Sequence, residues 1–223
     1  MAVGIPSTQM IPPASTEAFQ YKTKGGLLVN LAGPMYIQYA ASAAYNTSVT
    51  ETSILNNTVT TAQGTLSIPQ QGLAYGPLNS IALAPGTVIR VKLVGTIGNT
   101  ATPTLRIRTG LINQAGTVTT IADTTVLTMA TITGVGYFEY TAEIVVGAYS
   151  ASVGSMIGTS QLRYTTVAAP AQSAAMSFLQ AAQIATSSFD TTQTYALDVK
   201  ATWGTSSASN TITTGYAIVE MIS

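Results

Sequence analysis

The sequence predicts an all-β fold, and three observations lead to that prediction. Threonine accounts for 37 of the 223 residues, and β-branched residues favour strands over helices. Several segments alternate apolar and polar residues with a period of two, which is typical of a sheet with one buried face. Glycine and proline recur between these segments as turn signals. Together these features predict an antiparallel, jelly-roll-like β-sandwich with an extended N-terminal arm.

The first part of the chain, residues 1–50, differs from the rest and is interpreted as an arm or anchor segment. Pro6 and the pair Pro12-Pro13 cannot lie inside a sheet ladder. The short Ala-rich run at 40–44 has neither the cap nor the charge pattern of a helix. Two interpretations stay open. The segment is either a loosely structured leader or extra strand, or an arm that becomes ordered on contact with a partner.

The sandwich itself is expected over residues 51–223. Alternation is clearest in 88–97, 104–109, 137–146 and 195–203. Weaker strand candidates are 52–59, 64–68, 80–83, 117–121, 126–132, 161–167, 175–180 and 216–222. Turn signals fall at 84–86, 98–103, 113–116 and 134–136. Many short strands separated by such turns are typical of a sandwich.

The composition excludes several classes of function. The chain has no cysteine and no histidine, which excludes disulfides, thiolate or imidazole metal sites, and mechanisms that need a Cys nucleophile or a His base. Its 8 basic residues balance its 8 acidic ones, which argues against capture of nucleic acid or anionic lipid by clustered positive charge. The sequence lacks a long apolar run and a signal-peptide pattern. We therefore expect no cofactor, no nucleic-acid partner and no membrane segment.

Charged residues on the polar faces of three predicted strands form the clearest candidate site. These residues are Arg90, Lys92, Arg106, Arg108, Glu139 and Glu143. The short turn at 98–103 predicts that the two basic strands are neighbours, so that four positive charges share one sheet face and repel unless paired. The two glutamates could lie across from them. Pairing within one subunit is the simplest interpretation; ion pairs between subunits and a site for an anionic ligand are the alternatives.

A catalytic pair of carboxylates is not expected. Glu139 and Glu143 lie four residues apart on one strand, so about 13 Å separates their Cα atoms, whereas glycosidase carboxyls lie about 5 to 9.5 Å apart. The acidic residues Asp123, Asp190 and Asp198 are isolated in sequence and are interpreted as turn or surface positions. The chain is therefore predicted not to be an enzyme, and a polysaccharide-cleaving enzyme remains only as a rival.

The outward positions of the predicted strands are mostly Thr, Ser, Ala and Asn, and only 7% of the chain is charged. Soluble monomers usually carry more charge on outer faces and sheet edges. Uncharged faces suit packing against identical neighbours, because desolvating a charge costs far more than desolvating a hydroxyl that finds a partner. We therefore expect an obligate homo-oligomer, most readily a homotrimer or a unit of a larger shell.

Several motifs in order resemble a β-sandwich family found in structural proteins of tailed phages and other large DNA viruses. The motifs are Glu51-Thr52-Ser53-Ile54-Leu55, Leu83-Ala84-Pro85-Gly86-Thr87 with the strand after it, Thr102-Pro103-Thr104-Leu105, Trp203-Gly204, Asn210-Thr211-Ile212-Thr213 and Val219-Glu220. The resemblance covers about residues 50 to 223. It implies a non-enzymatic virion component of the head-decoration, spike or fibre kind, assembled in the host cytoplasm.

The motif residues are also expected to determine the fold. Trp203 ends an alternating strand and should anchor a core or an interface, and Asn210 should cap the last hairpin through its side chain. The arm at 1–50 is expected to contact the major capsid protein or other virion proteins. The sequence does not separate capsid shell, decoration, spike and fibre, and a receptor- or glycan-binding fibre module is the alternative function.

Overall fold

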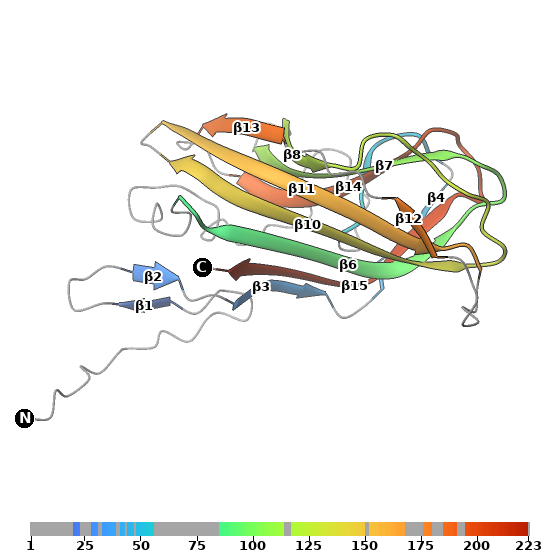
Figure 1. The fold of residues 1–223 in the computed structure, drawn as a ribbon, viewed down its shortest axis with the longest axis horizontal. Coiled ribbons are helices and arrows are strands. Elements are labelled where there is room, and N and C mark those ends of the chain that lie inside the picture. The colour runs from blue at the N-terminus through green and yellow to red at the C-terminus, as the bar shows by residue number, and fades with distance from the viewer. Residues whose placement is uncertain are drawn as a thin grey trace, which may run out of the picture.

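The structure is a computed structural model that describes residues 20–22, 28–30, 33–38, 41–42, 44–46, 48–55, 85–113, 117–149, 152–167, 176–179, 185–190 and 195–222. These ranges contain strands and turns but no helix, and therefore no helix that could cross a bilayer. Two antiparallel sheets pack face to face (Figure 1). The predicted fold class, an all-β antiparallel sandwich, is confirmed.

The larger sheet has eight strands in the order β12-β11-β10-β6-β15-β3, with β13 also paired to β11 and β4 to β15. Their bounds are β3 Gly33–Gln38, β4 Tyr45–Asn46, β6 Val88–Gly98, β10 Gly136–Tyr149, β11 Val153–Thr165, β12 Met176–Leu179, β13 Ala185–Asp190 and β15 Thr211–Ile222. The four long strands lie in the middle, and two short strands cover each outer edge. Short edge strands limit strand addition by other chains.

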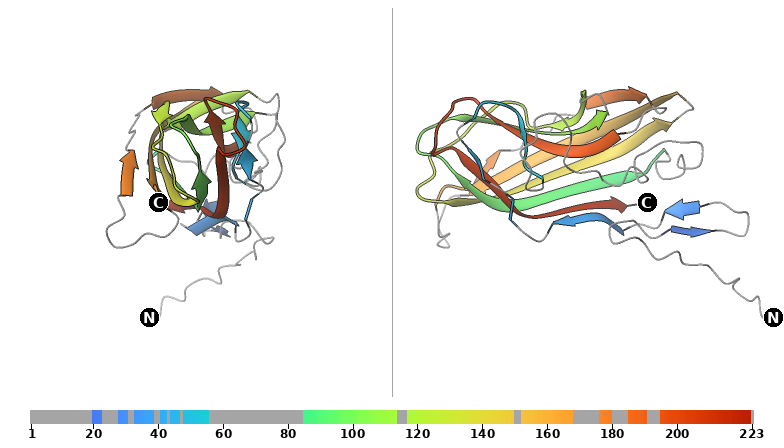
Figure 2. Two further views of the ribbon diagram at one scale, coloured as in Figure 1. Left: turned by 90° about the vertical axis from the view of Figure 1, so that its right-hand side faces the viewer. Right: turned by 180° about the vertical axis from the view of Figure 1, so that it is seen from behind.

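The smaller sheet has five strands in the order β5-β14-β7-β8, with β9 also paired to β7. Their bounds are β5 Thr52–Ser53, β7 Thr104–Asn113, β8 Val118–Asp123, β9 Leu127–Thr128 and β14 Tyr195–Trp203. A separate hairpin of β1 (Gln20–Lys22) and β2 (Leu28–Asn30) lies beyond the end of the two sheets (Figures 1 and 2).

The core lies between the two sheets, where the alternating positions of the long strands meet. Every inward residue predicted for 88–97, 104–109, 137–146 and 195–203 is buried. Trp203, Tyr140 and Tyr164 are the largest fully buried side chains. Since an aromatic residue of this size buries about 150 to 250 Å², these rings fill much of the space between the layers.

One side of the sandwich is closed by direct contact between β8 and β11. Gly158 of β11 allows this contact, because a Cβ there would lie 2.5 Å from the backbone oxygen of Ile121. The hydroxyl of Ser187 on β13 donates to the backbone oxygen of Thr120 on β8. The two sheets are thus joined by hydrogen bonding as well as by apolar packing along this side.

The predicted neighbourhood of the two basic strands is wrong. β6 and β7 belong to different sheets, because β10 and β15 already occupy both edges of β6. The turn at 98–103 is a crossover, and Asn99 anchors it: its Nδ2 donates to Ala130 O at 3.1 Å, and its Oδ1 accepts from Ile132 N at 3.0 Å. The four positive charges therefore divide between two outer faces.

The segment before Glu51 contributes to the sandwich. β3 and β4 both pair with β15, as the extra-strand interpretation expected for part of 1–50. Residues 1–19 lie outside the described ranges, as do the candidates 64–68 and 80–83. The candidate at 126–132 contains only the two residues of β9. Beyond β9, the backbone of Ala130 and Ile132 is bound by the side chain of Asn99 rather than by a neighbouring strand.

Candidate functional site

The outer face of the eight-stranded sheet carries a row of charges across β10, β6 and β15. Arg90 lies in register between Glu143 and Glu220, and its guanidinium contacts Glu143 at 3.0 Å and Glu220 at 3.2 Å. The hydrogen bond to Glu143 is the main reason that the pKa of Arg90 is raised. Arg90 and Glu143 are 44% and 53% exposed, so this pair adds little to stability.

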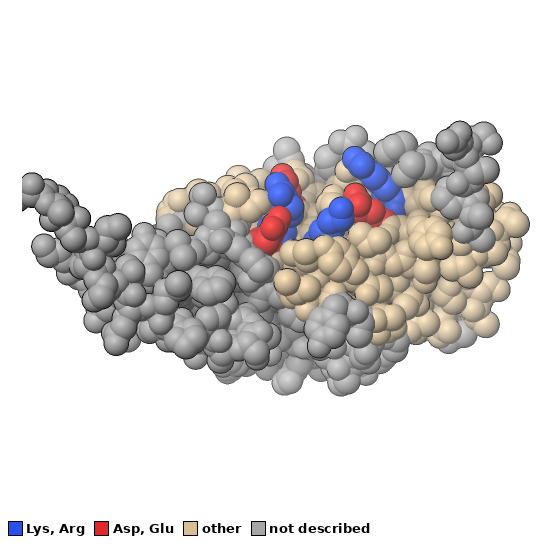
Figure 3. All heavy atoms as spheres, turned by 90° about the horizontal axis from the view of Figure 1, so that it is seen from below, with Lys and Arg blue, Asp and Glu red and all other residues tan. Residues whose placement is uncertain are grey.

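A second pair lies beside this row. Lys92 Nζ contacts Glu139 Oε2 at 2.8 Å across β6 and β10. The two glutamates therefore lie opposite Arg90 and Lys92, and all three pairs on this face form within one chain. Figure 3 shows these basic and acidic side chains gathered in the middle of the face. The interpretation as pairs between strands of one subunit describes this arrangement.

A polar hollow of about 420 Å³ lies beside these charges over β6, β10 and β11. All of its lining residues have side chains that can form hydrogen bonds, and they include basic, acidic and uncharged polar residues. They are Arg90, Glu139, Thr141, Glu143, Thr159, Ser160, Gln161 and Arg163. No group of three or more His, Cys, Asp or Glu side chains suited to a metal occurs in the described part of the chain. The hollow suits a hydrogen-bonding ligand better than an ion.

An apolar row crosses the same face next to the charged row. Ile157, Val145, Val88 and Ile222 lie in register on β11, β10, β6 and β15. Val145 and Ile157 are each 38% exposed. A sheet face that met only water would carry polar residues at these positions, so this row breaks the pattern of the outer face.

Further apolar side chains continue around the charged centre. Ile37 of β3 is exposed in register with Ile218, and Tyr216 lies in register with Val94. Tyr137, at the start of β10, is also exposed. Apolar residues therefore surround the ion pairs on several sides. Exposed apolar side chains gathered on one face in this way are typical of interaction sites.

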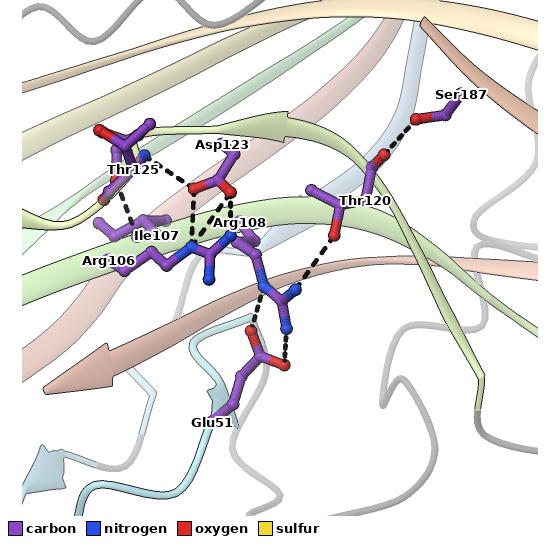
Figure 4. Close-up of polar contacts among 9 residues, drawn as sticks. Glu51, Arg106, Ile107, Arg108, Thr120, Asp123, Thr125 and Ser187 are labelled. Atoms are coloured by element: carbon purple, nitrogen blue, oxygen red, sulfur yellow. Dashed lines mark hydrogen bonds and ion pairs between the residues drawn. The ribbon is translucent and has the colours of Figure 1, made fainter. Parts of the chain in front are cut away.

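The outer face of the five-stranded sheet is built differently. Arg106 of β7 binds the carboxylate of Asp123 on β8 with two nitrogens, and its Nε lies 3.0 Å and 3.1 Å from the two carboxylate oxygens (Figure 4). Asp123 is only 6% exposed. The hydrogen bond to Asp123 is the main reason that the pKa of Arg106 is raised. Asp123 is a turn position as interpreted, since its Oδ1 accepts from Thr125 N at 2.8 Å just after β8. It is not a surface position, because the bidentate pair allows the carboxylate to be buried.

Arg108, two residues further along β7, continues the arrangement. It binds the carboxylate of Glu51 with two nitrogens and donates to Thr120 Oγ1 at 3.2 Å (Figure 4). Glu51 directly precedes β5, so this pair connects the chain before β5 to the middle of the sheet. Arg106 and Arg108 therefore have intrachain partners, like Arg90 and Lys92.

A buried carboxyl group lies on this face beside Arg108. Asp198 of β14 is 1% exposed, so its interpretation as a surface position is also wrong. Its Oδ1 accepts from Ser53 Oγ at 2.6 Å and from Val199 N at 2.8 Å. Its Oδ2 has no hydrogen-bond partner among the described residues. Burial raises the pKa of Asp198 to about 7, although Ser53 and the charge of Lys200 act in the opposite direction.

The hydrogen bonds of Ser53 explain how this site accommodates a proton on Asp198. Ser53 Oγ lies 2.6 Å from Asp198 Oδ1 and 2.9 Å from Leu55 O. One hydroxyl proton serves only one acceptor at a time. A proton on Asp198 can complete the bond to Ser53 Oγ while Ser53 donates to Leu55 O. When the carboxylate is ionised, the Ser53 hydroxyl proton serves only one of these two acceptors at a time.

The two remaining predicted residues belong to the frame of the sandwich. Trp203 is fully buried in the core. Asn210 Nδ2 donates to Thr205 O at 2.9 Å, and Asn210 N donates to Ser207 O at 3.1 Å. Asn210 therefore closes the loop between β14 and β15, as expected for a cap. The predicted last hairpin is wrong, because β14 and β15 belong to different sheets and the loop is a crossover. Both residues position strands and take no direct part in either outer face.

Sequence reasoning missed the apolar row on the larger sheet. A signal for it was present, because Ile144, Val145 and Val146 form a run of three apolar residues where strict alternation requires a polar one. The outward residue of such a run is the one to examine.

Comparison of the chain with protein-family models, curated proteins and solved structures gave no match.

Proposed function

We propose that this chain is a non-enzymatic structural protein of a virus particle, as a decoration, spike or minor capsid component, and that it assembles as a symmetric homo-oligomer. The observation that carries the proposal is the outer face of the eight-stranded sheet, which exposes apolar side chains around a group of ion pairs. A face of this composition suits burial against protein.

The pairing of the acidic residues supports a role without catalysis. Glu51, Asp123, Glu139, Glu143 and Glu220 each form an ion pair with a basic residue of the same chain. A general acid or base needs a carboxyl group that can exchange a proton with a substrate. Carboxylates held by Arg and Lys are suited to fixing strands instead.

The experiment uses the arm that the sequence assigns to contact with the capsid. Removal of residues 1–30 deletes β1 and β2, which among the described strands pair with each other alone, and spares β3 and β4. We expect full-length protein in purified virus particles, and loss of the truncated protein from them while its β-sheet circular dichroism is retained. Absence of the full-length chain from particles contradicts the proposed function, and normal incorporation of the truncated chain contradicts the anchoring role.

Recognition of a glycan or receptor is the second candidate, because of the polar hollow beside Arg90. Its lining of hydroxyl, amide and ionic groups suits a neutral saccharide better than an apolar or a strongly charged ligand. Self-assembly is favoured over it, because Arg90, Glu139 and Glu143 already bind one another or Lys92. Calorimetric titration with neutral oligosaccharides separates the two functions.

A further inference from the structure

We infer that two copies of this chain pair face to face through the outer face of the eight-stranded sheet, about a two-fold axis that runs parallel to the strands between β10 and β6. This inference rests on the proposed self-assembly and names the surface and the symmetry that carry it. The second copy is the partner because the face is complementary to itself in both polarity and charge.

The strand order determines what such an axis brings together. It places β10 of one copy against β6 of the other, and β11 against β15, while each cross-strand row stays opposite the same row of the second copy. The apolar row therefore meets itself, with Val145 opposite Val88 of the second copy and Ile157 opposite Ile222. Roughly aligned strands are also a common geometry for packed sheets.

The positions of the charged residues favour this axis over a two-fold axis that lies in the same plane but runs across the strands. With the axis along the strands, Glu143 faces Arg90 of the second copy and Arg90 faces Glu143, so each existing pair becomes part of a network of four charges. An axis across the strands through Lys92 instead places Glu143 against Glu139 of the second copy. Like charges buried together at an interface oppose association, so the first arrangement is favoured.

The size of the face is sufficient for a stable pair. The four long strands β11, β10, β6 and β15, at about 4.8 Å spacing and with about twelve residues at 3.3 Å each, give a face of roughly 19 by 40 Å, or about 760 Å². A standard specific interface buries about 800 Å² on each partner. The outer face therefore provides the required area without a contribution from the sheet edges, which the short strands cover.

The test is the mass of the purified full-length chain, measured by sedimentation at micromolar concentration, together with that of Val145→Glu. The monomer mass is 23.0 kDa, so a pair has twice that mass. We expect the native chain to sediment as the pair or a multiple of it. Val145→Glu should raise the dissociation constant by about a hundredfold or more, because each interface then contains two unpaired carboxylates.

Val126→Glu is the matched control. Val126 is 62% exposed and lies just before β9, away from the outer face, so the same substitution there should leave the mass unchanged. Ile157→Glu is a second variant in the apolar row, and the thermal midpoint of each variant shows that it is folded. A loss of association in Val145→Glu and Ile157→Glu, but not in Val126→Glu, supports the inference.

The contrary outcomes separate this inference from the proposed function. A native chain that is monomeric at all concentrations overturns both the pairing and the self-assembly. A stable oligomer that keeps its mass in both variants, or whose mass is three times that of the monomer, overturns the two-fold pairing and leaves self-assembly standing. Binding of a different protein to this face without self-association also overturns the pairing.

Discussion

The outer faces of the two sheets use a similar set of charged residues in opposite ways. On the five-stranded sheet, Asp123 and Asp198 are almost fully buried, and Arg106 donates hydrogen bonds from two nitrogens to the Asp123 carboxylate. On the eight-stranded sheet, Arg90 and Glu143 remain about half exposed and apolar side chains lie around them. The charged side chains on the smaller outer face are paired and largely buried within one chain, whereas those on the larger outer face stay about a third to a half exposed.

This difference shows where each face gains its stability. Buried, bidentate ion pairs are sensitive to the loss of one partner, because the other is left as an uncompensated charge. Exposed pairs are screened by water and contribute little. The smaller face is therefore expected to matter for folding and the larger face for association. The following variants test that division.

The largest effect on folding is expected from Asp198→Asn, through its dependence on pH. The folded-state pKa of Asp198 is raised by burial to about 7 from the ordinary value of 3.8 for an aspartate. The folded protein therefore holds this proton more tightly than the unfolded chain, and stability is lost as the pH rises from about 4 through 7. At pH 8 this group costs a few kcal/mol of unfolding free energy.

Urea denaturation at pH 5 and pH 8 measures this effect. The native chain should lose stability between the two pH values, while Asp198→Asn should lose less and be the more stable protein at pH 8. Ser53→Ala removes a hydrogen bond that lowers the pKa of Asp198. The folded-state pKa should then rise further, so the loss of stability should extend to higher pH values and become larger. A pH dependence that is identical in Asp198→Asn and the native chain would contradict the assignment.

A smaller effect is expected when one arginine is removed from each face. Arg106→Ala leaves Asp123 buried without its partner and should reduce the unfolding free energy by about 1 to 3 kcal/mol. Arg90→Ala, its matched counterpart, exposes Glu143 and Glu220 further to water and should leave the unfolding free energy almost unchanged, because these exposed pairs are screened by solvent. Urea denaturation at low protein concentration measures the unfolding free energy of both variants. Equal losses in Arg106→Ala and Arg90→Ala would contradict the proposed difference between the two faces.

Much of the fold could be predicted from the sequence, because period-two alternation reports directly which side chains point inward. The residues that alternation identified as inward in β6, β7, β10 and β14 are all buried. The placement of β6 and β7 in different sheets could not be predicted, since it depends on β10 and β15 occupying both edges of β6. Such pairings join residues far apart in sequence.

The candidate site was predicted only in part for the same reason. The pairing of Glu139 and Glu143 with Lys92 and Arg90 followed from their positions on polar strand faces. The partners of Arg106 and Arg108 did not, because Asp123 and Glu51 are isolated acidic residues that only the folded chain brings into contact with them. Burial of Asp198 likewise depends on contacts across the sheet rather than on its neighbours in sequence.

The most direct measurement of the central claim, that the larger outer face is an interface between two copies, is chemical cross-linking across it. The chain has no cysteine, so single substitutions Ile157→Cys and Ile222→Cys introduce unique thiols. In a mixture of the two proteins, a short bifunctional thiol reagent should join Ile157→Cys to Ile222→Cys in covalent dimers more efficiently than it joins either protein to itself. Equal or absent cross-linking in the mixture would contradict the claim.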